Sequence, residues 1–165
     1  MTPDALTLST LEKDDFQAAV QLVSLAMNAE EGRWAEKTLS RHFQCRQQGI
    51  ADGRNYFVLK DRDAVIGLGG LHHYVWGPPR IVWLAWFAIH PEAQGLGLGT
   101  RLLGSIEAEC VNRRYSKLLV ETYDHPDFDK ARSFYERMGF RIVGTIEDYL
   151  PDGSAMIVYG KIIPE

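Results

Sequence analysis

The segment Gln94-Gly95-Leu96-Gly97-Leu98-Gly99-Thr100 has the residue types of an anion-binding turn. It follows a strongly apolar stretch at 81–89 and precedes an amphipathic stretch that extends from Leu98 to about Val111. This order predicts a buried strand, a glycine turn and a helix. Glycines let the backbone approach a ligand closely, and free N–H groups at a helix N-terminus attract negative charge. The segment is therefore predicted to bind a diphosphate.

The glycine spacing distinguishes between known phosphate loops. A P-loop ends in Gly-Lys-Ser or Gly-Lys-Thr, but this chain has Gly99-Thr100-Arg101. A dinucleotide fingerprint needs a glycine at its sixth position, where Thr100 stands, so the spacing argues against a nicotinamide-dependent oxidoreductase. The pattern that fits is Gln-x-x-Gly-x-Gly, at Gln94, Gly97 and Gly99. A plain helix start, with glycines for close packing, is the alternative.

A second segment, from Ala131 to Phe140, predicts a helix that runs into a strand. Gly139 stands where a left-handed residue commonly ends a helix. Four apolar residues fall on one helical face: Phe128, Ala131, Tyr135 and Met138.

Together, the two segments resemble the GNAT superfamily of acetyl-CoA-dependent N-acetyltransferases. The resemblance rests on the run from Ala88 to Gly99 and on the Phe-Tyr-Glu-Arg-Met-Gly-Phe core at 134–140, which stand in the family's order and separation. The remaining segments also follow the family's order, so the resemblance covers nearly the whole chain. It implies transfer of the acetyl group of acetyl-CoA to a primary amine of a small molecule or a peptide N-terminus, by direct attack in a ternary complex.

The resemblance implies that acetyl-CoA is the cosubstrate and that main-chain groups bind it. The main-chain groups of Ala88 and Ile89 would pair with the pantetheine arm and face the thioester carbonyl. Hydrogen bonds and the helix dipole would act together on the diphosphate. The amide N–H groups concerned belong to Gln94, Gly95, Leu96, Gly97, Leu98, Gly99 and Thr100.

Tyr135 is the side-chain candidate for the catalytic acid. In the family, a tyrosine at this place in the motif lies near the sulfur and can protonate the departing thiolate. The apolar face on which Tyr135 stands also fits a core tyrosine without a catalytic role.

Glu121 is the candidate general base, because the apolar stretch at 81–89 lacks an acid. Many family members carry a glutamate near the position of Trp83. In the family, the strand of Glu121 adjoins that stretch, so Glu121 could reach the amine directly or through a water; it could also be a carboxylate bonded to an arginine or to solvent. His72 and His73 are alternatives, because histidine titrates near neutrality. Some acetyltransferases have no dedicated base.

The missing acid also favours a second function, a non-catalytic domain of the same fold that binds CoA as a sensor or interaction module. An intact Tyr135 favours the enzyme. The acceptor pocket is expected on the side of the sheet away from the helix that follows the glycines. Aromatic side chains are its candidate walls: Trp34, Tyr74, Trp76, Trp83, Trp86 and Tyr123.

Composition and charge indicate one globular domain over residues 1–165. The net charge of -4 argues against nucleic acid as a partner, because phosphate contacts need a basic face. The longest apolar run is too short to span a bilayer, and the first residues lack the pattern of a secretory signal. Cys45 and Cys110 are far apart in the sequence, which fits a reducing compartment. We therefore expect a cytoplasmic protein without a membrane partner.

Neither a metal site nor a particular oligomer is indicated by the sequence. The five histidines are scattered along the chain, so no metal is expected. A homodimer formed through sheet edges or the C-terminal strands, as in many relatives, is compatible with the resemblance.

The remaining segments predict a mixed, mostly antiparallel α/β sheet with helices on both faces, which is also the layout that the resemblance implies. Seven strands are expected, at 5–9, 55–60, 64–74, 81–89, 118–123, 140–146 and 155–163. Four helices are expected, at 16–27, 35–48, 98–111 and 128–138, with a charged break at Glu30-Glu31-Gly32 before the second.

Overall fold

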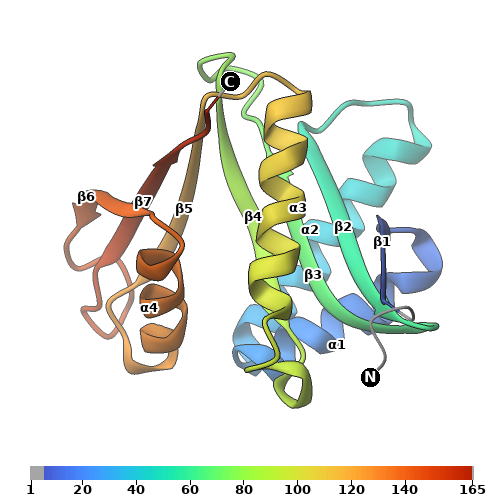
Figure 1. The fold of residues 1–165 in the computed structure, drawn as a ribbon, viewed down its shortest axis with the longest axis horizontal. Helices are drawn as coiled ribbons and strands as arrows, with labels where there is room; N and C mark the ends of the chain where they lie inside the picture. The colour runs from blue at the N-terminus through green and yellow to red at the C-terminus, as the bar shows by residue number, and fades with distance from the viewer. Residues whose placement is uncertain (1–5, 165) are drawn as a thin grey trace.

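A seven-stranded sheet organises the protein (Figure 1). The computed structural model describes residues 6–164. Within them the strands are β1 (Leu6–Thr10), β2 (Arg54–Asp61), β3 (Ala64–His72), β4 (Ile81–Ile89), β5 (Lys117–Tyr123), β6 (Arg141–Ile146) and β7 (Met156–Ile162). Their order is β1-β2-β3-β4-β5-β7-β6, and each neighbouring pair is antiparallel except β4 and β5. The predicted mixed sheet is confirmed; Ala5, where its first strand was expected to begin, lies outside the described residues.

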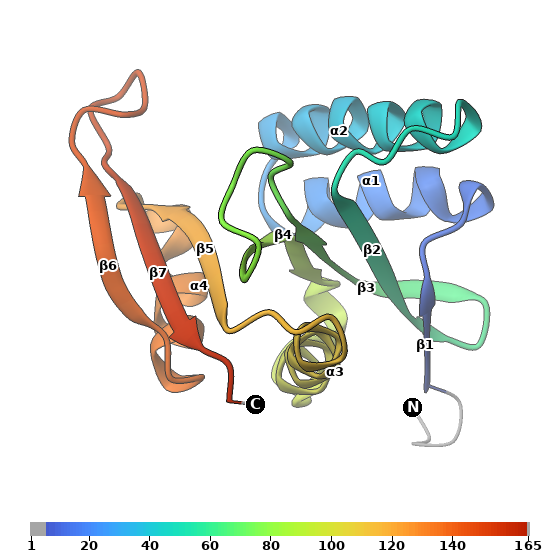
Figure 2. The same cartoon turned by 90° about the horizontal axis from the view of Figure 1, so that it is seen from above.

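Helices cover both faces of the sheet, as predicted. The four α-helices of the described residues are α1 (Phe16–Ala26), α2 (Ala29–Gln47), α3 (Leu98–Asn112) and α4 (Asp129–Arg137). Figure 2 shows α1 and α2 on one face, and α3 and α4 on the other. Each face has its own apolar core, with Leu22 and Leu39 in the first and Leu102 and Ile106 in the second. Of the helices in residues 6–164, none is long and apolar enough to cross a membrane.

The start of α2 differs from the prediction. A break is expected at Glu30-Glu31-Gly32, but these residues already belong to the helix. The side chain of Asn28 caps it by accepting a hydrogen bond from the Glu31 amide at 2.9 Å, and the acidic first turn is favourable to the helix dipole. Gly32 does not end the helix. It lets α2 pack closely on α1, because an added Cβ would lie 2.7 Å from the Cβ of Ser24.

Strands β4 and β5 pair over a short distance and then separate. Their parallel register joins residues 81–83 to residues 117–119, whereas β3 pairs with β4 as far as Ile89. Along its whole length β5 is paired with β7 on its other side. Figure 1 shows β4 and β5 diverging from the end of the sheet that lies near the C-terminus. Beyond Trp83, the edge of β4 that faces β5 therefore has no strand partner.

A bulge in β4 changes the direction of its side chains. Opposite Gly69 of β3, strand β4 carries two residues, Trp86 and Phe87, instead of one. Trp86 has a φ of 32°, and its indole N–H donates a hydrogen bond to the Thr38 hydroxyl at 2.7 Å. Trp86 packs toward α1 and α2, while Phe87 packs into the core beneath α3. The bulge therefore lets adjacent aromatic residues serve both faces of the sheet.

We expect Gly32→Ala to destabilise the protein, although alanine is the better helix former. Overpacking against Ser24 must separate α1 from α2, so the free energy of unfolding should fall by about 1–3 kcal/mol. Gly104 is the matched control, because it stands in α3 with no atom within 4 Å of an added Cβ. Gly104→Ala should raise the free energy of unfolding by roughly 0.5–1 kcal/mol. Urea unfolding measures the free energy of unfolding of both variants. An equal rise in both would contradict close packing at Gly32.

Candidate active site

A cleft of about 1150 Å³ opens where β4 and β5 separate. Its walls come from the start of α2, the ends of β2 and β3, β4, β5, α4 and the loop between β6 and β7. Both predicted catalytic residues, Glu121 and Tyr135, line it. Of the aromatic residues expected at the acceptor pocket, Trp76 instead projects into solvent with 85% of its surface exposed. The others line the cleft: Trp34, Tyr74, Trp83, Trp86 and Tyr123.

The glycine turn leaves a row of amide N–H groups without acceptors. Gly95 and Gly97 have φ angles of 77° and 75°, which glycine adopts without strain, and Gly97 is the N-cap of α3. Within residues 6–164, no hydrogen bond uses the N–H of any residue from Gly95 to Thr100. The first bond of α3 runs from the Arg101 N–H to the Gly97 carbonyl at 3.1 Å. These N–H groups are therefore available to an anion at the positive end of the helix.

Ala88 and Ile89 lie at the end of the open edge of β4. Their side chains are buried on opposite faces of the sheet, so this edge offers a ligand main-chain groups. The Ile89 carbonyl accepts a hydrogen bond from the Gln94 side-chain amide at 3.1 Å, and the Gln94 N–H donates to the Pro91 carbonyl at 3.2 Å. Gln94 therefore joins the turn to the strand. Its own N–H already donates a hydrogen bond, unlike the N–H groups of the rest of the predicted turn.

Tyr135 is buried in α4 and directed at the cleft. Its ring lies 6.4 Å from that of Phe87 and 5.6 Å from that of Phe140, between ring centroids. Among the described residues its hydroxyl has no hydrogen-bond partner, and burial raises the pKa of Tyr135 far above its ordinary value of 10.0. The phenol therefore stays protonated at neutral pH. The helix ends at Gly139 with a φ of 84°, as predicted, and the Phe140 N–H closes it by donating to the Tyr135 carbonyl at 3.0 Å.

Glu121 stands on the opposite face of the sheet from Tyr135. The parallel register aligns Trp83 with Leu119, and alternation puts Leu119 and Glu121 on one face, the face of α1 and α2. The carboxylate of Glu121 is accessible from the cleft but has no ion pair or hydrogen bond with the described residues. Burial by the cleft walls raises the pKa of Glu121 above its ordinary value of 4.5. Bonding to a neighbouring arginine, the alternative drawn from the sequence, does not occur within residues 6–164.

The two alternative bases have different surroundings. His72 lines the cleft, where burial and then the Arg54 guanidinium lower its pKa to about 4. A group with so low a pKa is a weak base at neutral pH. His73 points elsewhere: its Nε2 lies 3.3 Å from the Pro78 carbonyl and its ring stacks on Tyr115 with centroids 5.7 Å apart.

Glu31 is a cleft residue that sequence analysis did not identify. It stands in the first turn of α2, and its half-buried carboxylate has no ion pair with any described residue. Burial raises the pKa of Glu31, and the negative charges of Glu30 and Glu121 raise it further. No local pattern could have placed Glu31 here, since its position depends on how α2 packs on the sheet.

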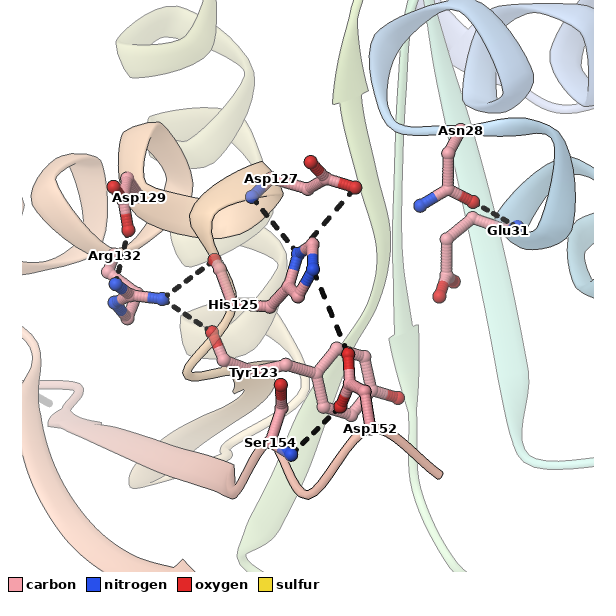
Figure 3. Close-up of polar contacts among 9 residues, drawn as sticks. All are labelled: Asn28, Glu31, Tyr123, His125, Asp127, Asp129, Arg132, Asp152 and Ser154. Atoms are coloured by element: carbon pink, nitrogen blue, oxygen red, sulfur yellow. Dashed lines mark hydrogen bonds and ion pairs between the residues drawn. The ribbon is translucent and has the colours of Figure 1, made fainter. Parts of the chain in front are cut away.

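Arg132 connects the end of β5 to α4 (Figure 3). Its guanidinium donates to the Tyr123 carbonyl at 2.6 Å and to the His125 carbonyl at 3.1 Å, and it also pairs with Asp129. Arg132 therefore fixes the helix that carries Tyr135 against the strand that carries Glu121.

His125 joins two loops at the rim of the cleft (Figure 3). Its Nδ1 accepts a hydrogen bond from the Asp127 N–H at 3.2 Å, and its Nε2 lies 3.8 Å from the carboxylate of Asp152 in the β6–β7 loop. In the part of the chain that the structure describes, no three His, Cys, Asp or Glu side chains are grouped to hold a metal ion.

Thr122 has a buried hydroxyl without a hydrogen-bond partner. Its side chain lines the cleft and is 4% exposed, and its Oγ1 is the one fully enclosed side-chain polar atom of residues 6–164 that has no partner. An unpartnered buried hydroxyl is destabilising unless a ligand or water satisfies it. Thr122 therefore marks a point where the cleft can hold a polar ligand group.

Comparison with known proteins agrees with this geometry. A family model described as acetyltransferase (GNAT) family matches residues 19–140. The blasticidin-S acetyltransferase of Streptomyces morookaense is 32% identical over 91 residues, which make up 52% of this chain and 57% of that protein. The chain therefore spans a little over half the length of this curated relative.

Solved structures share the fold over nearly the whole chain. A structure from Desulfovibrio desulfuricans assigned to the GNAT family has a TM-score of 0.85 at 20% identity, over 97% of this chain and 100% of that one. A GNAT acetyltransferase from Elizabethkingia anophelis with acetyl-CoA bound has a TM-score of 0.70 at 16% identity, over 96% and 99% of the two chains. Identities this low show the fold alone.

We expect Glu31→Gln to raise the melting temperature at pH 7.5, by roughly 1–3 °C. The folded protein retains the Glu31 proton at higher pH than the unfolded chain, so ionisation opposes folding progressively above the ordinary pKa of 4.5. The gain should disappear below that pH, where both states are protonated. Glu36→Gln, on the exposed side of α2, is the control and should change nothing. Thermal unfolding followed by circular dichroism measures the effect; a lowered melting temperature would contradict an unpaired carboxylate at Glu31.

Proposed function

This chain belongs to the acetyltransferase (GNAT) family, and from that premise we propose that it transfers the acetyl group of acetyl-CoA to a primary amine of a small molecule. The observation that carries the proposal is the cleft between β4 and β5, whose walls bear an unpaired carboxylate, Glu121, and a free phenol, Tyr135. The Streptomyces relative is named for blasticidin-S, which supports a small-molecule acceptor. A peptide N-terminus is the alternative acceptor.

The main chain of this protein supplies the proposed binding groups for acetyl-CoA, the cosubstrate typical of the family. The free N–H groups from Gly95 to Thr100 suit its diphosphate, because hydrogen bonds and the helix dipole both favour an anion there. The unpaired edge of β4 beyond Trp83 suits an extended arm that contains amides, since such an arm can pair with it as a strand would. The buried hydroxyl of Thr122 offers a further partner.

The proposed reaction is direct attack of the amine nitrogen on the thioester carbonyl. A C–N bond forms and the C–S bond breaks, while the nitrogen loses a proton and the sulfur gains one. Glu121, on the face of α1 and α2, takes the proton from the amine directly or through a water. Tyr135, which burial keeps protonated, donates a proton to the departing thiolate. Glu121 and Tyr135 stand on opposite faces of the sheet. This arrangement suits an amine and an acetyl-CoA molecule that enter the cleft from different sides.

A non-catalytic CoA-binding domain is the second candidate function. The observation that favours it is the absence of an acid from β4, where Trp83 lines the cleft instead. Glu121 supplies a carboxylate on the same face, which is why we prefer the enzyme.

Release of free CoA thiol tests the proposed activity. The protein should release it from acetyl-CoA when supplied with primary amines, amino acids or short peptides, and the rate should saturate with both substrates. Calorimetric titration should show that acetyl-CoA binds without an acceptor. Binding without release from any acceptor would contradict the transferase and favour the sensor, and release confined to peptides would replace the small-molecule acceptor.

We expect Tyr135→Phe and Glu121→Gln each to lower kcat by roughly a hundredfold, the usual contribution of general acid–base catalysis, with little change in acetyl-CoA affinity. Tyr159→Phe is the matched control for the phenol. Tyr159 packs on Tyr135 with ring centroids 6.2 Å apart, but its hydroxyl donates to Glu136 at 3.0 Å and its side chain does not line the cleft, so kcat should be retained. Steady-state kinetics and calorimetry separate these effects. Full turnover in either cleft variant would exclude that residue from the mechanism.

A further inference from the structure

Resting on the proposed acetyl transfer, we infer that the acceptor carries a second positive charge besides the reacting amine, and that Glu31 is the residue that recognises it. Glu121 then faces the reacting amine, and Glu31 binds the second cationic group from the other wall of the cleft. The acceptor class is thus a small dication, such as a diamine or an amine with a guanidinium group.

Two carboxylates without partners face the cleft from different elements. Glu31 comes from the first turn of α2 and Glu121 from β5. Neither has an ion pair or a side-chain hydrogen bond within residues 6–164. Figure 3 shows the Glu31 carboxylate extending from the start of α2, and Glu31 and Tyr123 both line the cleft. A half-buried carboxylate that lacks a partner, as Glu31 does, opposes folding, so its retention at a site calls for a ligand that compensates it.

The electrostatics of the cleft connect the two carboxylates. The charge of Glu121 contributes to the raised pKa of Glu31, and both charges contribute, after burial, to the raised pKa of Tyr123. The charge of Glu121 also raises the pKa of Tyr74, after burial. One negative field therefore extends from α2 across to β5. Such a field in a cleft concentrates cations.

Few cationic side chains line the cleft to oppose that negative field. Arg54 is the one Arg or Lys among the described residues of the cleft wall. The acidic lining residues are Glu30, Glu31, Glu121, Asp127 and Asp152. Asp127 and Asp152 both face His125, with ring nitrogens 3.6 Å and 3.8 Å from their carboxylates. The half-buried carboxylate of Glu31 and the more exposed ones of Glu30 and Glu121 are therefore left to a cationic ligand.

The aromatic walls of the cleft favour a cationic ligand independently of the acids. These walls include Trp83, whose ring lies 6.0 Å from that of Tyr74, and Tyr123, which stacks on Tyr149 with centroids 6.0 Å apart. Aromatic faces attract ammonium and guanidinium groups and also contact the alkyl chain between two charges.

Equilibrium binding of matched amines tests the inference without turnover. The protein saturated with CoA is titrated calorimetrically with linear diamines of four to six carbons and with monoamines of the same length. Each diamine of suitable length should bind roughly tenfold more tightly than its monoamine, as expected for one additional charge-assisted contact. Glu31→Gln should remove this preference and leave monoamine affinity nearly unchanged. Glu36→Gln, which changes the same charge on the exposed side of α2, should keep it.

Equal affinity for diamines and monoamines, undetectable binding of both, or a preference that survives Glu31→Gln would overturn the inference. CoA release, measured on the same amines, separates its failure from that of the proposed function. Release without a diamine preference contradicts only the recognition of a second charge. A Glu31-dependent preference without release contradicts only the acetyl transfer.

Discussion

The short pairing of β4 with β5 is the constraint on which the site depends. If β4 and β5 paired along their whole length, the hydrogen-bonding groups at the edge of β4 would be satisfied and the sheet would be continuous. Here the pairing stops at Trp83, and β5 continues with β7 alone. The cleft, the free edge of β4 and the access of both sheet faces to one space all follow from this divergence. The bulge at Trp86 and Phe87 adds aromatic walls to each side of it.

Unpaired polar groups distinguish the site from the rest of the molecule. Elsewhere several half-buried charges have partners, as when Lys60 pairs with Asp15 at 2.6 Å. At the cleft, by contrast, Glu31, Glu121, Thr122 and the Tyr135 hydroxyl have none within residues 6–164. A fold selected only for stability would not keep so many unsatisfied groups together. Their common location therefore carries as much functional information as their identities.

How well the sequence predicts each feature depends on whether its cause is local. The boundaries of β4 and the left-handed end of α4 at Gly139 follow from an apolar run and a helix-ending glycine, and both were predicted. Glu30-Glu31-Gly32 looks like a break, because its composition is polar and the packing of Gly32 on Ser24 is not visible in the sequence. For the same reason Glu31 was missed, whereas Glu121 and Tyr135 were named as candidates. Tyr135 stands in a local motif and Glu121 was named through the family resemblance, whereas the position of Glu31 depends on tertiary packing.

The contacts of Arg132 have a consequence for how such a protein can change during evolution. Glu121, Arg132 and Tyr135 all belong to one continuous stretch of chain from β5 through α4, so the proposed base, the proposed acid and the clamp between them would be inherited as a unit. Glu31 belongs to α2, in a separate part of the gene. If these proposed roles hold, substitutions in α2 would alter which acceptor is admitted without disturbing the proposed base and acid. The molecule would be modular in this sense, with new acceptors arising around an unchanged pair of proton-transfer groups.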